Sequence, residues 1–159
     1  GKFRRQRQMC IRDSIISFAW AVSAMMLLVL ENNIIIDQNI FYQFISLFLF
    51  VFAITIPFDI RDIEYDSKKI ITIPLFFGVK ASKIIAFIAL LMCGMISFFL
   101  HMESVLNLPN LLALILLYIL SFVFIQKSDK KNGKMYFSFW VESLSIFSCV
   151  LLIVSELIL

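Results

Sequence analysis

Long apolar runs alternate with short polar segments along the 159 residues of this chain. Runs of this kind are typical of membrane-spanning helices, because about 20 apolar residues in a helix cross the hydrocarbon core of a bilayer. Lipid offers backbone groups no hydrogen-bond partners, so helices are favoured despite the many β-branched and aromatic side chains. The pattern predicts an all-α, multi-pass bundle of about five transmembrane helices. Their expected ranges are 15–30, 40–57, 84–100, 108–125 and 137–159.

The composition agrees with this interpretation. Apolar types make up 62% of the chain, 18 residues are phenylalanine, and the mean hydropathy is +0.97. Soluble domains are usually about half apolar, and disordered chains are poor in apolar residues. Both classes are therefore excluded, and the chain is expected to lie in a lipid bilayer.

The charged residues are unevenly distributed. Residues 1–14 hold five basic residues and one acidic residue, whereas the other 145 residues hold nine basic and ten acidic residues. The stretch Arg4–Ser14, RRQRQMCIRDS, resembles the translation of a sequencing adaptor. We therefore expect residues 1–14 to be a non-native tail and residues 15–159 to form the membrane domain. Without the tail the chain has no excess of positive charge, so no nucleic-acid partner is expected.

The basic residues outside the tail lie in alternate loops. Segments 31–39 and 101–107 contain no lysine or arginine, whereas segments 58–83 and 126–136 contain five and four. Cytoplasmic loops of membrane proteins are enriched in these residues. The alternation predicts that the two basic loops are cytoplasmic and that the C-terminus lies on the opposite side. We expect the membrane to be a bacterial inner membrane.

Three aspartates follow the second apolar run. Asp59, Asp62 and Asp66 are spaced at i, i+3 and i+7, which places them on one face if the helix continues past Pro57. At about 6 Å and an effective dielectric of about 20, each close pair of carboxylates repels by about 3 kcal/mol. A hard divalent cation with oxygen ligands would offset this repulsion, and Mg²⁺ is the natural candidate.

Basic residues accompany these carboxylates. Arg61, Lys68 and Lys69 lie beside them in the sequence. Carboxylates that hold a divalent cation, together with basic side chains that bind phosphate oxygens, suit a diphosphate leaving group. A position at the membrane surface suits a substrate with a charged head and an apolar tail. The alternative is a non-enzymatic membrane protein or transporter with a solvated loop, in which mixed charges pair with one another and contribute little.

One further carboxylate, Glu142, lies inside the last apolar run. A charged group at that place is costly if it faces lipid. We expect it either to face the bundle interior, where it would belong to the site, or to lie near the membrane interface.

The acidic segment resembles the second aspartate-rich motif of the UbiA superfamily of intramembrane prenyltransferases. The shared features are the run Arg61-Asp-Ile-Glu-Tyr-Asp66, the basic pair Lys68 and Lys69, and the later Thr72 and Gly78. The usual glycine after the basic residues is absent, because Lys69 is followed directly by Ile70. The resemblance implies a nine-helix bundle of which this chain supplies the C-terminal half, helices five to nine, with a first aspartate motif upstream.

The same resemblance implies a reaction. In the full-length protein, a prenyl group would pass from a prenyl diphosphate to an aromatic or other lipophilic acceptor in a Mg²⁺-dependent step, and this chain alone would be inactive. Asp62 and Asp66 would be catalytic and metal-binding, with Asp59 as a further metal ligand. The residues that bind the diphosphate would be Arg61, Lys68 and Lys69. CDP-alcohol phosphotransferases, another diphosphate-linked class, are not matched, because the glycine and arginine spacing of their motif is absent.

Overall fold

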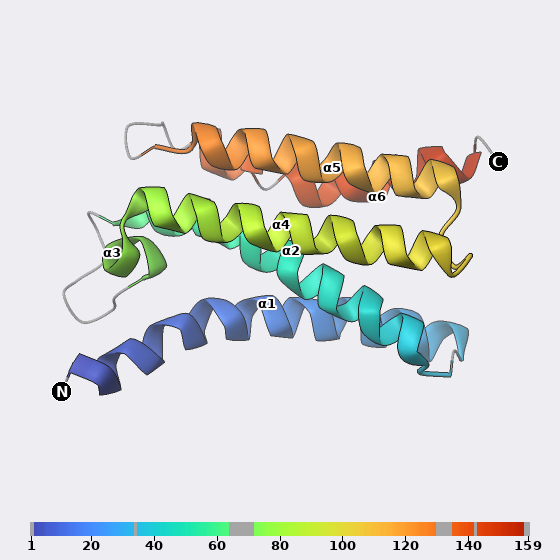
Figure 1. The fold of residues 1–159 in the computed structure, drawn as a ribbon, viewed down its shortest axis with the longest axis horizontal. Helices are drawn as coiled ribbons and strands as arrows, with labels where there is room; N and C mark the ends of the chain where they lie inside the picture. Colours follow the sequence, from blue (N-terminus) through green and yellow to red (C-terminus); the bar gives the residue numbers. More distant parts are fainter. Residues whose placement is uncertain (1, 34, 64–71, 130–134, 142, 158–159) are drawn as a thin grey trace.

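The computed structural model describes residues 2–33, 35–63, 72–129, 135–141 and 143–157. Over these residues every regular element is a helix, which confirms the predicted helical membrane bundle. Four helices are long and apolar enough to cross a membrane, and they run along one another in alternating directions (Figure 1). They are α1 (Lys2–Asn32), α2 (Gln38–Asp62), α4 (Val79–Met102) and α5 (Leu108–Lys127).

The first and last apolar runs differ from the ranges expected from hydropathy. α1 begins at Lys2 rather than near residue 15, and its apolar part is Ser14–Glu31. Arginine and glutamine are good helix formers, so the polar start of the chain extends the helix by local propensity. The last apolar run forms two elements, the π-helix η1 (Tyr136–Val141) and the α-helix α6 (Ser143–Leu157).

A short helix lies where hydropathy predicts only a loop. α3 (Ile73–Phe77) has a proline in its first turn, where a missing backbone N–H leaves no hydrogen bond unmade. Gly78 ends the helix with a φ of 83°, a conformation that glycine adopts without strain. α4 begins directly afterwards, so α3 packs against both α2 and α4.

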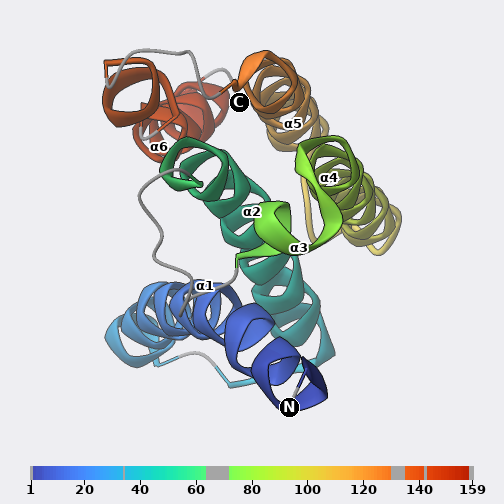
Figure 2. The ribbon, with the colours of Figure 1, turned by 90° about the vertical axis from the view of Figure 1, so that its left-hand side faces the viewer.

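α2 lies at the centre of the bundle (Figure 2). It packs against α1 and α4, while α5 packs against α4 and α6. Small buried side chains at Ala53, Ala86, Ala89 and Cys93 belong to the core shared by α2 and α4. Small residues let helix backbones approach closely, which is how helices associate inside membranes. The position of α2 places its last turn among several neighbouring elements.

The helix ends lie on two opposite sides of the bundle. The end of α2, the start of α4 and the end of α5 lie on the same side as the start of α1 (Figure 1). The turns from α1 to α2 and from α4 to α5 lie on the other side, with the end of α6. This arrangement agrees with the alternation of basic and non-basic loops. The side of the membrane that each end faces stays a prediction.

Candidate functional site

α2 carries three charged side chains in its last turn, Asp59, Arg61 and Asp62, called here the charged cluster. The helix continues past Pro57 as predicted, so the two aspartates lie one turn apart on the same stripe. Asp59 is buried, with 5% of its surface exposed, whereas the Asp62 side chain is 39% exposed. The C-terminal end of a helix carries partial negative charge. Both carboxylates therefore lie where further negative charge is disfavoured.

Part of the predicted site falls outside the described residues. Asp66, Lys68 and Lys69 lie in one such segment, and Glu142 lies in another, so the roles expected of them stay predictions. Within the described ranges, no three histidine, cysteine, aspartate or glutamate side chains form a group that could hold a metal ion. The described part of the expected cation site is therefore the two aspartates of the charged cluster.

These two carboxylates have the donor chemistry of a hard divalent cation. Mg²⁺ is commonly bound by one or two carboxylates together with phosphate oxygens. An ionised carboxylate offers about four lone-pair positions, so Asp62 can accept from a neighbouring arginine and still contact a cation. The burial of Asp59 adds to the cost of its charge, which a cation would offset. The residues present therefore fit a divalent cation.

Arg61 forms a forked ion pair with Asp62. Its Nε donates to Asp62 Oδ1 at 2.7 Å, and Nη2 donates to Oδ2 at 2.9 Å. The guanidinium carbon also lies 5.4 Å from the ring centre of Phe58 and 5.7 Å from that of Phe137. These distances are in the range of cation–π interactions. Arg61 is thus held beside the carboxylates by an ion pair and by ring contacts.

Sequence reasoning expected Arg61 to bind phosphate but missed both rings. Phe58 precedes Arg61 by three residues, a spacing that brings side chains together on a helix. The contact between Phe58 and Arg61 could therefore have been predicted from the sequence. Phe137 comes from η1, near the other end of the chain, and no local pattern connects it with Arg61.

Lysines add positive charge at this end of the bundle. Lys83 Nζ donates to the carbonyl oxygen of Gln126 at 2.7 Å and so caps the last turn of α5. Lys80, in the first turn of α4, and Lys127, at the end of α5, are exposed. Clustered positive charge attracts anionic ligands toward a site. The lysines at this end of the bundle thus favour an anionic head group.

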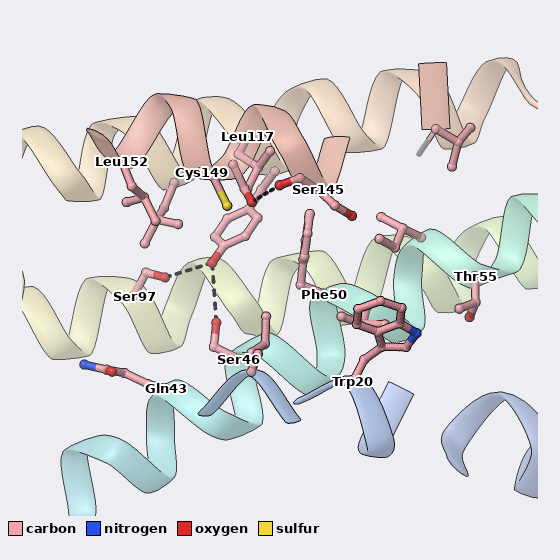
Figure 3. Close-up of a pocket in the computed structure, with 18 of the residues that line it drawn as sticks. Trp20, Gln43, Ser46, Phe50, Thr55, Ser97, Leu117, Ser145, Cys149 and Leu152 are labelled. Atoms are coloured by element: carbon pink, nitrogen blue, oxygen red, sulfur yellow. Dashed lines mark hydrogen bonds between the residues drawn. The ribbon is translucent and has the colours of Figure 1, made fainter. Parts of the chain in front are cut away.

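An apolar cavity of about 790 Å³ begins beside the charged cluster. Its near end is lined by Phe58, which directly precedes Asp59, and by Thr55, about one turn earlier, and Gln43 lines it farther along α2 (Figure 3). At 1.5 Å per residue, the wall from Phe58 to Gln43 is about 22 Å long. The other walls come from α1, α4, α5, η1 and α6, and from Leu106 between α4 and α5. Cavities of this size and character hold small-molecule ligands.

Tyr118 provides a polar group in the middle of this apolar wall. Its hydroxyl lies 3.4 Å from Ser46 Oγ and 3.2 Å from Ser97 Oγ, so α2, α4 and α5 are joined at one point (Figure 3). Hydrogen bonds between helices hold membrane bundles together. Sequence reasoning missed this cluster, because single serine and tyrosine residues in apolar runs do not reveal which helices they face.

The model of the UbiA prenyltransferase family matches residues 3–148 of the chain. The match includes the charged end of α2 and most of the elements that line the cavity. No curated protein and no solved structure matches the chain. The family match agrees with the resemblance of the acidic segment, and it extends that resemblance from one motif to most of the chain.

Proposed function

This chain belongs to the UbiA prenyltransferase family, and we propose that it binds a prenyl diphosphate whose prenyl group is transferred to an aromatic or other lipophilic acceptor. The observation that carries the proposal is the position of the charged cluster at the near end of the apolar cavity. Phe58 lines the cavity and also contacts Arg61. A substrate with a charged head and a long apolar tail matches both features at once.

The cavity supports binding of the prenyl tail. Its lining is mostly aliphatic and aromatic, and burial of each apolar carbon of the tail contributes about 0.8 kcal/mol. The length of the α2 wall, about 22 Å, accommodates an extended chain of several isoprene units. Apolar walls also exclude water, so that the acceptor rather than water reacts with the activated carbon.

The charged cluster supports binding of the diphosphate. The cation ligands in this proposal are Asp59, Asp62 and Asp66, and the cation is Mg²⁺. The phosphate-binding residues are Arg61, Lys68 and Lys69. When bound, the cation would neutralise charge that develops on the departing diphosphate. Arg61 contributes fixed donors for the same oxygens, because a guanidinium presents five N–H groups in a planar fork.

The orientation in the membrane belongs to the same proposal. The lysine and arginine bias of the loops supports a cytoplasmic position for the charged cluster. The diphosphate would then enter from the cytoplasm, while the tail and the acceptor would reach the cavity through the bilayer. A bacterial inner membrane is the compartment that we propose.

Ligand binding tests the proposal, because the resemblance predicts only one of two aspartate motifs in this chain. The purified chain in detergent is titrated calorimetrically with farnesyl diphosphate, once with Mg²⁺ and once with EDTA. We expect binding that needs Mg²⁺, and only weak binding of farnesol, which lacks the charged head. Asp62→Ala and Asp66→Ala should each weaken binding of farnesyl diphosphate by about tenfold or more, because each removes a charged ligand.

Asp37→Ala is the matched control for these substitutions. Asp37 caps the opposite end of α2, where its Oδ1 accepts a hydrogen bond from the Ile40 backbone N–H at 2.9 Å. This variant should bind farnesyl diphosphate as the unmodified chain does. Equal affinity in Mg²⁺ and EDTA, or normal affinity in both Asp62→Ala and Asp66→Ala, would refute the proposal and favour the solvated loop of a non-enzymatic membrane protein.

A further inference from the structure

Phe137 connects the C-terminal part of the chain to the charged cluster. Its ring centre lies 5.7 Å from the guanidinium carbon of Arg61 and 6.4 Å from the ring centre of Phe58. Phe58 and Phe137, called here the aromatic clamp, therefore both contact the arginine that pairs with Asp62. The clamp joins an α2 side chain to one from η1, and the two elements are packed together.

Phe137 is held firmly in this place. Its side chain is fully buried, at 0% exposure. The neighbouring Tyr136 ring packs edge-on against it at 5.2 Å, and the Tyr136 hydroxyl donates to the Phe124 carbonyl oxygen at 2.6 Å. Burial raises the pKa of Tyr136, and a hydrogen bond with Ser128 partly offsets this rise. The Phe137 ring, which faces Arg61, is thus held in η1 beside a tyrosine that is hydrogen-bonded to α5.

The ion pair and the clamp hold Arg61 in different ways. Asp62 accepts from two of the five N–H donors of the guanidinium, whereas the rings contact the guanidinium without using any donor. If a cation binds the Asp62 oxygens, the N–H groups of Arg61 can donate to phosphate instead. The aromatic clamp meanwhile keeps the guanidinium carbon in place. Without the clamp, a side chain that is 30% exposed would gain rotamer freedom, which binding must then remove.

We propose that Phe137 is a positioning residue, which acts through Arg61 to hold the guanidinium where it can bind the diphosphate. This inference rests on the proposed function, because it assumes that Arg61 binds phosphate. It assigns to η1 a role at the charged cluster that is additional to packing. The rival explanation is that Phe137 only fills the core, and the experiment separates the two by asking whether its effect depends on Arg61.

The probe is inorganic pyrophosphate with Mg²⁺, titrated into the full chain in detergent and followed by calorimetry. Pyrophosphate has no prenyl tail, so changes in the cavity do not affect the measured affinity. Phe137→Met retains an apolar side chain of similar size but removes the π face. We expect it to weaken pyrophosphate binding about three- to tenfold, whereas Phe137→Tyr, which keeps the ring, should stay within about twofold of the unmodified chain.

Phe122→Met is the matched control. The Phe122 ring pairs with Phe87 at 4.9 Å, between α5 and α4, so the substitution removes a comparable ring contact that does not involve Arg61. Pyrophosphate affinity should be unchanged in this variant. If Phe137→Met does not fold, Phe58→Met tests the other ring of the clamp, and the tail-free probe should show a comparable loss.

A double-mutant cycle decides between positioning and packing. Arg61→Gln removes the guanidinium, so adding Phe137→Met to it should cause no further loss of pyrophosphate affinity. Additive losses in the double variant, or normal affinity in Phe137→Met, would overturn the inference while leaving the proposed function intact. If the unmodified chain binds no pyrophosphate in the presence of Mg²⁺, the proposed function fails, and the inference fails with it.

Discussion

Asp59→Asn should stabilise the chain without a divalent cation and destabilise it, relative to the unmodified chain, with one. Asp59 is 5% exposed and lies in the last turn of α2, three residues before Asp62. The asparagine side chain has nearly the same shape but no charge. The substitution therefore removes negative charge from a helix end that disfavours it, and it also removes a charged ligand from the proposed cation site.

The change in the free energy of unfolding has two opposing contributions: the removal of an unfavourable charge and the loss of a ligand for the cation. A carboxylate at the negative end of a helix costs about 0.3–1 kcal/mol, and up to about 2 kcal/mol when partly buried. Repulsion from Asp62 adds to this cost, although Arg61 offsets much of that second charge. We expect the free energy of unfolding to rise by about 1–2 kcal/mol in Asp59→Asn with EDTA. A ligand at 100 times its Kd stabilises the native state by about 2.7 kcal/mol, so Mg²⁺ should reverse the order of the two proteins.

Both contributions are measured by unfolding the purified chain in mixed micelles, with and without Mg²⁺. Unfolding is followed by helical circular dichroism. Asp37→Ala serves as a control on the same helix, since that carboxylate caps the favourable end. It should lose about 1 kcal/mol, equally with Mg²⁺ and with EDTA. The reasoning is refuted if Asp59→Asn is less stable than the unmodified chain in EDTA, or if Mg²⁺ stabilises both proteins equally.

Two further predictions concern the cavity. Tyr118→Phe removes a hydroxyl that joins three helices, and we expect a loss of about 0.5–1.5 kcal/mol in the same unfolding assay; unchanged stability would show that these contacts contribute nothing. In a Cys10→Ser background, a maleimide should label the exposed Cys149, which lines the cavity, but not the buried Cys93. Farnesyl diphosphate with Mg²⁺ should slow the labelling of Cys149, and an unchanged rate would place the prenyl tail elsewhere.

The charged cluster shows which neighbouring residues can be predicted from their spacing along a helix. The spacing of Asp59 and Asp62 determines that they share a stripe wherever the helix continues, and α2 does continue past Pro57. The same reasoning finds Phe58 beside Arg61, because residues three apart on a helix are neighbours. Asp66 lies outside the described residues, so the third position of the stripe stays a prediction.

Hydropathy predicted the membrane-spanning helices but did not predict where they begin and end. The bilayer requires helices of a certain length, so long apolar runs suffice to predict the spans of α2, α4 and α5. The start of α1 and the division between η1 and α6 depend instead on local propensity and packing, which leave little trace in mean hydropathy. α3 was not predicted, because its five residues are too few to form a clear hydropathy pattern.

Apolar runs and residue spacing were enough to predict a helical membrane bundle with the aspartates and arginine of the charged cluster at the end of one helix. The cavity beside them and the packing of Phe137 on Arg61 depend on how the helices are arranged in three dimensions. Neither could be predicted from a linear pattern, because lipid and core are equally apolar. A membrane helix is apolar on every face, so its sequence does not mark the face that meets its neighbours.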